Sequence, residues 1–141
     1  MVHRGASFRE AGAGVPVVCI HASASSSGQW RPLTERLAGR FRSLAVDLYG
    51  YGQSPPWPDE QPLSLADEAE LIEPVLEAVG DRIHVIGHSY GGAVALKAAL
   101  VRPGPPARVA GAAGATRRIA GLDRDPPVAR AARRHFSCPG R

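Results

Sequence analysis

The sequence predicts an α/β fold with a parallel sheet flanked by helices, and three observations lead to that prediction. Short apolar runs rich in β-branched residues recur along the chain, and such runs are typical of strands that are buried on both faces of a parallel sheet. Segments with helical periodicity lie between these runs. The hydrophobic share of 44% and the charged share of 21% are those of a globular domain. With 141 residues the chain has room for one core.

Three apolar runs are predicted to be central strands. They are Val15 to Ile20, Ser43 to Val46 and Ile83 to Ile86. Phe8 to Glu10 is expected to add an edge strand before the first of them. Because helical segments separate the central strands, we expect them to be parallel and joined by right-handed crossovers.

Three segments are predicted to be helices. They are Gln29 to Ala38 and Ser64 to Val79, in which apolar residues are spaced by three and four, and the Ala-rich segment Gly91 to Val101. Ser64 with Asp67 three residues later has the pattern of a capping box, and Gly80 is well placed to end the second helix. The element order is therefore strand and helix in alternation.

The composition changes after residue 101. Arg, Ala, Pro and Gly supply 29 of the 40 residues from 102 to 141. Residues 1–101 hold 8 Lys/Arg against 11 Asp/Glu (net −3), whereas residues 102–141 hold 9 Arg against two Asp (net +7). So few large apolar side chains cannot offset the entropy of ordering a segment. We therefore divide the chain into a structured unit, residues 1–103, and a basic tail, residues 104–141, that we expect to be largely disordered.

Several classes of protein are disfavoured by composition. No run of about 18 apolar residues could cross a membrane, and Met1 to Glu10 lacks the apolar region of a secretory signal. Cys19 and Cys138 lie too far apart in sequence to suggest a disulfide framework or a metal site. We expect a cytoplasmic protein with free thiols, no metal and no cofactor.

One motif is typical of a catalytic site. Gly87-His88-Ser89-Tyr90-Gly91 has the Gly-x-Ser-x-Gly pattern, which puts a serine on a tight, strained turn where glycines let a strand and a helix approach. The motif directly follows the predicted strand Ile83–Ile86 and opens the predicted helix. This context makes Ser89 the expected nucleophile, and the alternative is an ordinary turn between a strand and a helix.

A serine that attacks a carbonyl needs fixed N–H donors for the oxyanion. The backbone N–H of Tyr90, at the start of a helix, is the first candidate. The second is expected from the small-residue turn His21 to Gly28. Three nearby polar residues are predicted to be structural or non-catalytic: His21 bracing that turn, Asp47 organising the loop after it, and His88 lining the pocket.

Three linked segments resemble the N-terminal half of the α/β-hydrolase fold, over about residues 8 to 103. They read Val-Val-Cys-Ile-His-Ala-Ser from residue 17, Asp-Leu-Tyr-Gly-Tyr-Gly-Gln-Ser from residue 47 and Ile-Gly-His-Ser-Tyr-Gly-Gly from residue 86. The resemblance implies a serine hydrolase with a nucleophile elbow at Ser89 and an oxyanion hole formed by the N–H groups of Tyr90 and Ser23. This chain has Ala22 where the family usually has glycine.

The resemblance also bears on the substrate. Dehalogenases and epoxide hydrolases of this fold carry aspartate where this chain has Ser89. A serine implies an esterase-like enzyme whose partner is a small acyl compound: an ester, thioester, lactone or amide-like molecule. The sequence gives no indication of a nucleic acid or a membrane as partner.

The family requires an acid and a histidine after the serine, because the histidine takes the serine proton and the acid orients the histidine. Asp123 or Asp125 followed by His135 has this order, but the acid and the histidine are only 12 or 10 residues apart, on no predicted strand. The change of composition after residue 103 suggests a frame change or a truncation. We therefore expect this chain to be inactive alone.

Two other functions stay open at this point. The chain could be a non-catalytic binding or interaction protein, or it could self-associate through an unpaired sheet edge at Ile83–Ile86. Nucleic-acid binding through the basic tail is the weaker alternative, because no aromatic residues interleave with the arginines and no nucleic-acid motif is present.

Overall fold

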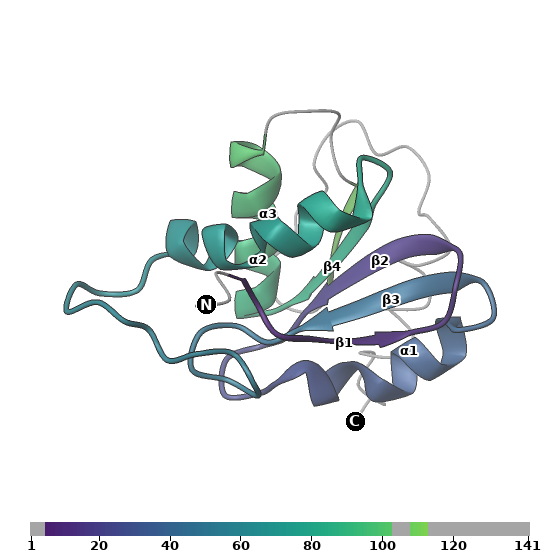
Figure 1. Cartoon of the computed structure of the whole chain (residues 1–141), viewed down its shortest axis with the longest axis horizontal. Coiled ribbons are helices and arrows are strands. Elements are labelled where there is room, and N and C mark those ends of the chain that lie inside the picture. The colour runs from purple at the N-terminus through teal and green to yellow at the C-terminus, as the bar shows by residue number, and fades with distance from the viewer. Residues whose placement is uncertain (1–4, 103–107, 113–141) are drawn as a thin grey trace, which may run out of the picture.

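The computed structural model describes residues 5–102 and 108–112, and in these residues a five-stranded sheet lies between helices (Figure 1). The strand order is β1-β3-β2-β4-β5; β1 is antiparallel to β3, and the other neighbouring strands are parallel. The strands are β1 (Phe8–Ala11), β2 (Val15–Ile20), β3 (Phe41–Val46), β4 (His84–His88) and β5 (Arg108–Ala112). The helices are the 3₁₀ helix η1 (Ser27–Trp30), α1 (Arg31–Leu37), α2 (Leu65–Val79) and α3 (Tyr90–Val101).

The predicted α/β fold is confirmed, and so is each predicted strand and helix, with small shifts at the ends. The helix predicted from Gln29 starts earlier, as η1, because the Ser26 hydroxyl accepts the Gly28 N–H and caps that turn. The capping box of α2 is present: the Ser64 hydroxyl accepts the Asp67 N–H, and the Asp67 carboxylate accepts the Ser64 N–H at 2.8 Å. Local polar residues thus set where these helices begin.

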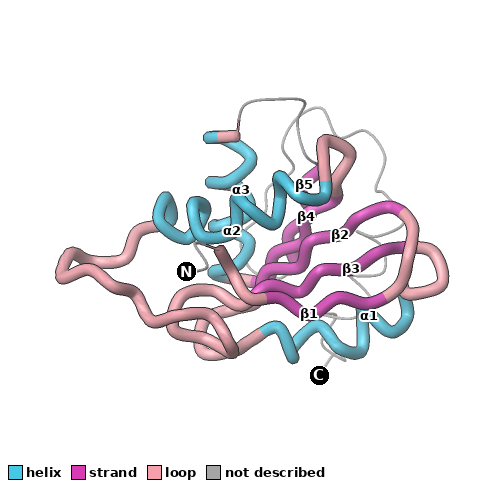
Figure 2. The backbone as a smooth tube through the Cα atoms, in the orientation of Figure 1, coloured by secondary structure: helices cyan, strands magenta, loops and turns pink. Residues whose placement is uncertain are grey.

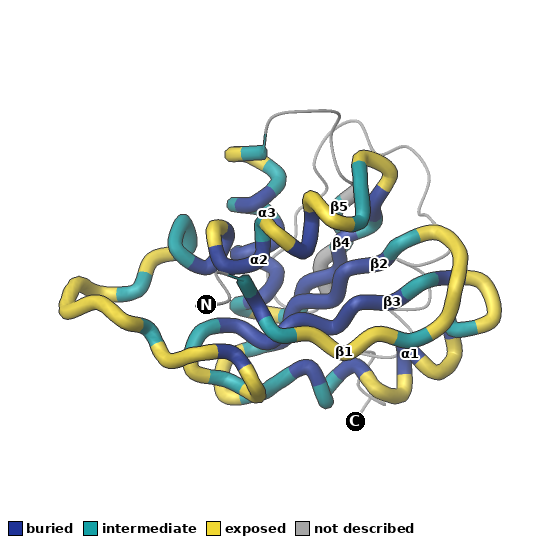
Figure 3. Tube along the Cα trace, in the orientation of Figure 1, coloured by how far each residue is buried: buried dark blue, intermediate teal, exposed yellow. Residues whose placement is uncertain are grey.

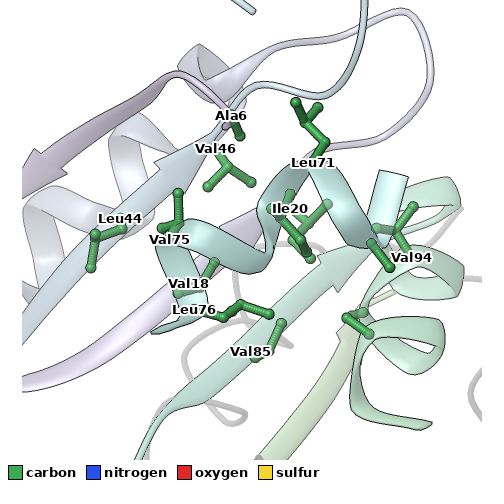
Figure 4. Close-up of a cluster of buried hydrophobic side chains, with 14 of the residues drawn as sticks. Ala6, Val18, Ile20, Leu44, Val46, Leu71, Val75, Leu76, Val85 and Val94 are labelled. Atoms are coloured by element: carbon green, nitrogen blue, oxygen red, sulfur yellow. The ribbon is translucent and has the colours of Figure 1, made fainter. Parts of the chain in front are cut away.

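The central strands β2, β3 and β4 are buried on both faces, which explains their continuous apolar runs, whereas the edge strand β1 is largely exposed (Figure 3). Alternate residues of β2 point to opposite faces. Val18 and Ile20 pack in the core that includes residues of α2 and α3 (Figure 4). Val17 and Cys19 pack on the other face with Trp30, which has no exposed surface.

The order in which strands are added to the sheet reverses at β2. The chain moves from β2 to β3 on one side and then returns past β2 to β4 on the other. Crossovers of one hand then place α1 and α2 on opposite faces, and Figure 2 shows them there. In open α/β sheets such a reversal leaves a crevice at the carboxyl ends of the strands, where ligands bind.

Strand β5 corrects one prediction about the tail. Residues 108–112 pair in parallel with β4, in the register Val85 to Val109 and His88 to Ala112. The expectation of disorder is therefore wrong for these residues, and β4 is not the edge at which we expected self-association. These residues form a strand because Val109 packs against the core on one face of the sheet and Ala110 against the core on the other. Their short side chains also lose little entropy on ordering.

The remainder of the predicted tail, residues 104–107 and 113–141, lies outside the described residues, as does residue 103. No helix in the described part of the chain is long and apolar enough to span a membrane.

Candidate functional site

The carboxyl ends of β2 and β4 lie side by side and carry the predicted site residues. Ile20 pairs with Gly87, so each strand ends level with its neighbour. Beyond this pair, β2 leads into residues 21–26, here named the Ala22 turn, and β4 leads into residues 87–91, here named the Ser89 turn. The next strand, β3, leads into residues 47–54, here named the Asp47 loop.

Ser89 connects β4 to α3 through a strained backbone conformation. Its φ of 51° and ψ of −115° lie outside the regions that a residue with a side chain normally adopts. Such strain persists only where the surrounding structure enforces it, and it concentrates at functional sites. Ser89 is an exposed residue in the described part of the chain.

Two glycines permit this sharp turn. A Cβ on Gly91 would overlap the carbonyl oxygens of Ile20 and His21, and a Cβ on Gly87 would overlap the backbone of Gly91. Strand β4 and helix α3 therefore approach each other, and the end of β2, more closely than any side chain would allow. The predicted steric role of the two glycines is confirmed.

Helix α3 supplies N–H groups next to Ser89. Gly92 and Ala93 donate to the Ser89 carbonyl at 2.9 and 3.3 Å, so the first turn of the helix closes directly on this residue. Tyr90 is the first helical residue, and the first N–H groups of a helix have no partner within the helix. The positive end of the helix dipole lies at the same place. This geometry suits an oxyanion donor, although the role of Tyr90 remains a prediction.

The Ala22 turn holds the second predicted donor. Ser23 is exposed and follows directly after Ala22, whose N–H donates to Gln29 Oε1 at 3.1 Å. Ala24 has a φ of 56°, and its N–H donates to the hydroxyl of Tyr51 at 3.2 Å. The turn is thus held on both sides of Ser23, whose own role is untested.

His21 braces the Ala22 turn, as predicted. It is fully buried; its Nδ1–H donates to the Ala22 carbonyl at 2.7 Å, and its Nε2 accepts the Leu48 N–H at 3.0 Å. Burial lowers the pKa of His21, which favours this neutral form. Because both ring nitrogens are occupied by backbone groups, His21 is not placed to act as a base.

Asp47 organises the loop that follows it, also as predicted. Its buried carboxylate accepts the N–H groups of Ser27 at 2.6 Å and Gln53 at 3.1 Å. The Ser54 hydroxyl donates to the Asp47 carbonyl at 2.6 Å. Gly52 has a φ of 52°, and a Cβ there would overlap the carboxylate. A single carboxylate therefore fixes the Asp47 loop and the start of η1.

Neither of the other two described histidines is placed as a base for Ser89. His84 begins β4, five residues before Ser89 and thus about 16 Å away along the strand. His88 is held through Nδ1 by the side-chain amide of Gln29 at 2.8 Å. The predicted acid and base, Asp125 and His135, lie outside the described residues, as does Asp123.

Sequence reasoning missed Glu68 and Gln29. Glu68 is fully buried in the first turn of α2, where its Oε2 accepts the Tyr49 N–H at 3.2 Å. Burial raises its pKa, and burial and then the Glu68 charge raise the pKa of the Tyr90 phenol. The sequence held a signal for Glu68, because its spacing from Leu65 and Ile72 places it on the apolar face of the helix. No comparable signal marked Gln29.

Comparison with known proteins agrees with this geometry. A family model described as "Alpha/beta hydrolase family" matches residues 17–140. A solved alpha/beta hydrolase from Sphaerobacter thermophilus is 32% identical, with a TM-score of 0.66 over 76% of this chain and 40% of that chain.

Two curated relatives are named for different activities. The chain is 35% identical over 92 residues to a pimeloyl-[acyl-carrier protein] methyl ester esterase of Aliivibrio salmonicida, covering 65% of this chain and 33% of that protein. It is 37% identical over 95 residues to a haloalkane dehalogenase of Agrobacterium fabrum, covering 67% of this chain and 31% of that protein. The chain thus matches about a third of the length of these curated relatives.

Proposed function

The chain belongs to the alpha/beta hydrolase family, and from that premise we propose that Ser89 is the nucleophile of a hydrolase acting on carboxylic esters or related acyl compounds. The observation that carries the proposal is the exposed, strained Ser89 between β4 and α3, with the N-terminus of a helix directly behind it. A nucleophile elbow demands a strained turn of this kind.

In the proposed reaction the Ser89 oxygen attacks the acyl carbon, and a base removes the serine proton. The carbonyl oxygen becomes an oxyanion that accepts hydrogen bonds from the N–H groups of Tyr90 and Ser23. When the intermediate collapses, the alcohol leaves with a proton and an acyl ester remains on Ser89. Water then attacks this ester and releases the carboxylic acid.

The chemistry of serine favours acyl substrates over alkyl ones. Attack by Ser89 on an alkyl halide or an epoxide would form an ether, which water does not cleave. Attack on an acyl carbon forms an ester, which water does cleave. Among the relatives, the Aliivibrio esterase therefore supports the proposed reaction better than the Agrobacterium dehalogenase does.

The proton acceptor limits what this chain does alone. His21, His84 and His88, the described histidines, are each engaged or placed elsewhere. Without a base, the oxyanion donors and substrate binding still leave a residual acceleration of about 10³-fold in serine hydrolases of known mechanism. We propose that the chain alone forms the acyl ester slowly and shows negligible turnover.

Two measurements test this proposal. n-Butylboronic acid, which forms a tetrahedral adduct with a nucleophilic serine, should bind the wild-type chain and not Ser89→Ala; equal binding by both would refute the role of Ser89. Hydrolysis of p-nitrophenyl acetate should be negligible. Robust turnover that Ser89→Ala abolishes would contradict the proposed inactivity, and its loss in His135→Ala would assign the base to His135.

A further inference from the structure

The side chain of Gln29 joins the Ala22 turn to the Ser89 turn. Its Oε1 accepts the N–H of Ala22 at 3.1 Å, and its Nε2 contacts Nδ1 of His88 at 2.8 Å. Ala22 directly precedes Ser23, and His88 directly precedes Ser89. One side chain therefore spans the two turns that would supply the nucleophile and both oxyanion donors.

The chemistry of the three groups fixes how this bridge is made. The Ala22 N–H can only donate, so the amide oxygen of Gln29 must face it. The amide NH₂ then faces His88, whose Nδ1 must accept. His88 is therefore neutral, with its proton on Nε2, whenever the bridge is complete.

Gln29 is itself held rigidly. It lies in η1, whose last residue, Trp30, is fully buried. The Ser27 N–H donates to the buried Asp47 carboxylate at 2.6 Å, and the Gln29 N–H donates to the Ser26 carbonyl at 3.0 Å. A side chain that starts from such an anchored turn can define the position of its partners.

The bridge continues the sheet where backbone pairing stops. The β2–β4 ladder ends at the pair Ile20 and Gly87. The Gln29 amide connects the chains just past this point, by accepting from Ala22 on one side and donating to His88 on the other. It thus adds a side-chain link between the two chains just beyond the last backbone pair.

We propose that Gln29 is a positioning residue that sets the separation between the Ser23 N–H and the Tyr90 N–H. The inference rests on the proposed function for its chemical meaning, because two oxyanion donors must be fixed before the substrate arrives. The residue before the predicted donor Ser23 is Ala22, and its N–H is fixed by the hydrogen bond to Gln29 Oε1. This bond restrains the backbone of the Ala22 turn directly before Ser23.

Gln29→Met tests the bridge independently of any activity, because methionine has a similar shape and cannot form either hydrogen bond. In ¹⁵N-labelled chain, the amide resonances of Ser23 and Tyr90 should shift and the Ala22 amide should exchange faster with solvent. Gln61→Met, at an exposed glutamine of the long loop before α2, is the matched control and should change none of them. A folded Gln29→Met chain with unchanged Ser23 and Tyr90 resonances would overturn the proposal.

The affinity for n-butylboronic acid tests whether the bridge matters to the site. Loss of one oxyanion donor costs about 10²- to 10³-fold in known serine hydrolases, so displacement of a donor in Gln29→Met should weaken binding about tenfold. Unchanged affinity alongside shifted resonances would make the bridge merely structural and refute the positioning role. If the wild-type chain did not bind the boronic acid at all, the proposed function would fail, and the resonances would still decide whether Gln29 joins the turns.

Gln29→Glu provides a rescue experiment and a second variant if Gln29→Met does not fold. The carboxylate still accepts the Ala22 N–H, and it can accept from His88 once the imidazole proton has moved from Nε2 to Nδ1. In the ¹⁵N spectrum of His88, Nδ1 should therefore change from an unprotonated to a protonated nitrogen, and the Ser23 and Tyr90 resonances should stay closer to their wild-type positions than in Gln29→Met. An Nδ1 that remains unprotonated in Gln29→Glu would contradict the proposed contact with His88.

Discussion

The Asp47 loop leaves β3 and the Ser89 turn leaves β4 at the same edge of the sheet. In the Asp47 loop the Asp47 carboxylate is buried and accepts two backbone N–H groups, and glycines, Gly50 and Gly52, occupy both positions with positive φ. In the Ser89 turn a serine takes the strained position and its side chain is exposed. The hydrogen bonds of the Asp47 loop stabilise the fold, whereas the strained backbone of Ser89 costs stability.

The largest effect should come from the steric requirement of the Ser89 turn. Gly91→Ala places a methyl group against the carbonyl oxygens of Ile20 and His21, so we expect a loss of about 4 kcal/mol or more, or failure to fold. Gly92→Ala is the matched control, since its Cβ would lie 3.6 Å from the nearest atom. Alanine also favours a helix, so unfolding in urea should show that this control is as stable as wild type or up to about 1 kcal/mol more stable.

Asp47→Ala should have the next largest effect. It leaves the buried N–H of Ser27 without its acceptor, at a cost of about 1 to 3 kcal/mol, and it also removes the acceptor of the part-buried Gln53 N–H, so we expect a loss of about 3 kcal/mol in total. Asp59→Ala removes a comparable carboxylate that accepts an N–H in an exposed loop. Urea unfolding should show less than about 0.5 kcal/mol for this control. Equal losses would remove the contrast between the two kinds of loop.

Ser89→Gly should stabilise the chain by about 1 kcal/mol, because glycine adopts a φ of 51° without strain. Ser89→Ala keeps a Cβ and should leave the stability near that of wild type. Thermal unfolding of the pair measures the strain at this position. If both variants were equally stable, the backbone of Ser89 would not be strained.

Glu68→Gln should produce a smaller effect that depends on pH. Burial raises the pKa of Glu68 in the folded state, so the stability that the protonated carboxyl contributes is present below the unfolded value near 4.5 and is lost as the pH rises through the folded value. The amide has no proton to lose. We expect equal stability near pH 4 and an advantage of about 1 kcal/mol for the variant at pH 8, measured by urea unfolding. An advantage that does not change with pH would show that Glu68 has an ordinary titration.

The sequence carried the fold and the steric features of the site, because both arise from local patterns. Apolar runs of β-branched residues defined β2, β3 and β4, and the Gly-x-Ser-x-Gly spacing located the Ser89 turn. Strand β5 was missed because its small residues resemble the surrounding Ala- and Gly-rich segment, and only pairing with β4 distinguishes it. Gln29 was missed for a related reason: its partners, Ala22 and His88, come together only through the sheet.

Residue type alone does not distinguish catalytic from structural polar residues in this fold. His21 and Asp47 have the side chains of catalytic residues, yet their ring nitrogens and carboxylate oxygens are bonded to backbone groups. Ser89 is chemically plain by comparison. Its strained backbone and its exposure make this serine the candidate for chemistry.

Site mapping of acylation tests the central claim most directly. The chain is exposed to p-nitrophenyl acetate, digested, and analysed by tandem mass spectrometry for acetylated serines. Our account predicts one acetyl group at Ser89, in preference to the serines at 25–27 in and beside the Ala22 turn, and loss of that selective label in Ser89→Ala. Acetylation of Ser89 no faster than that of the other serines would contradict the claim that this turn is built for a nucleophile.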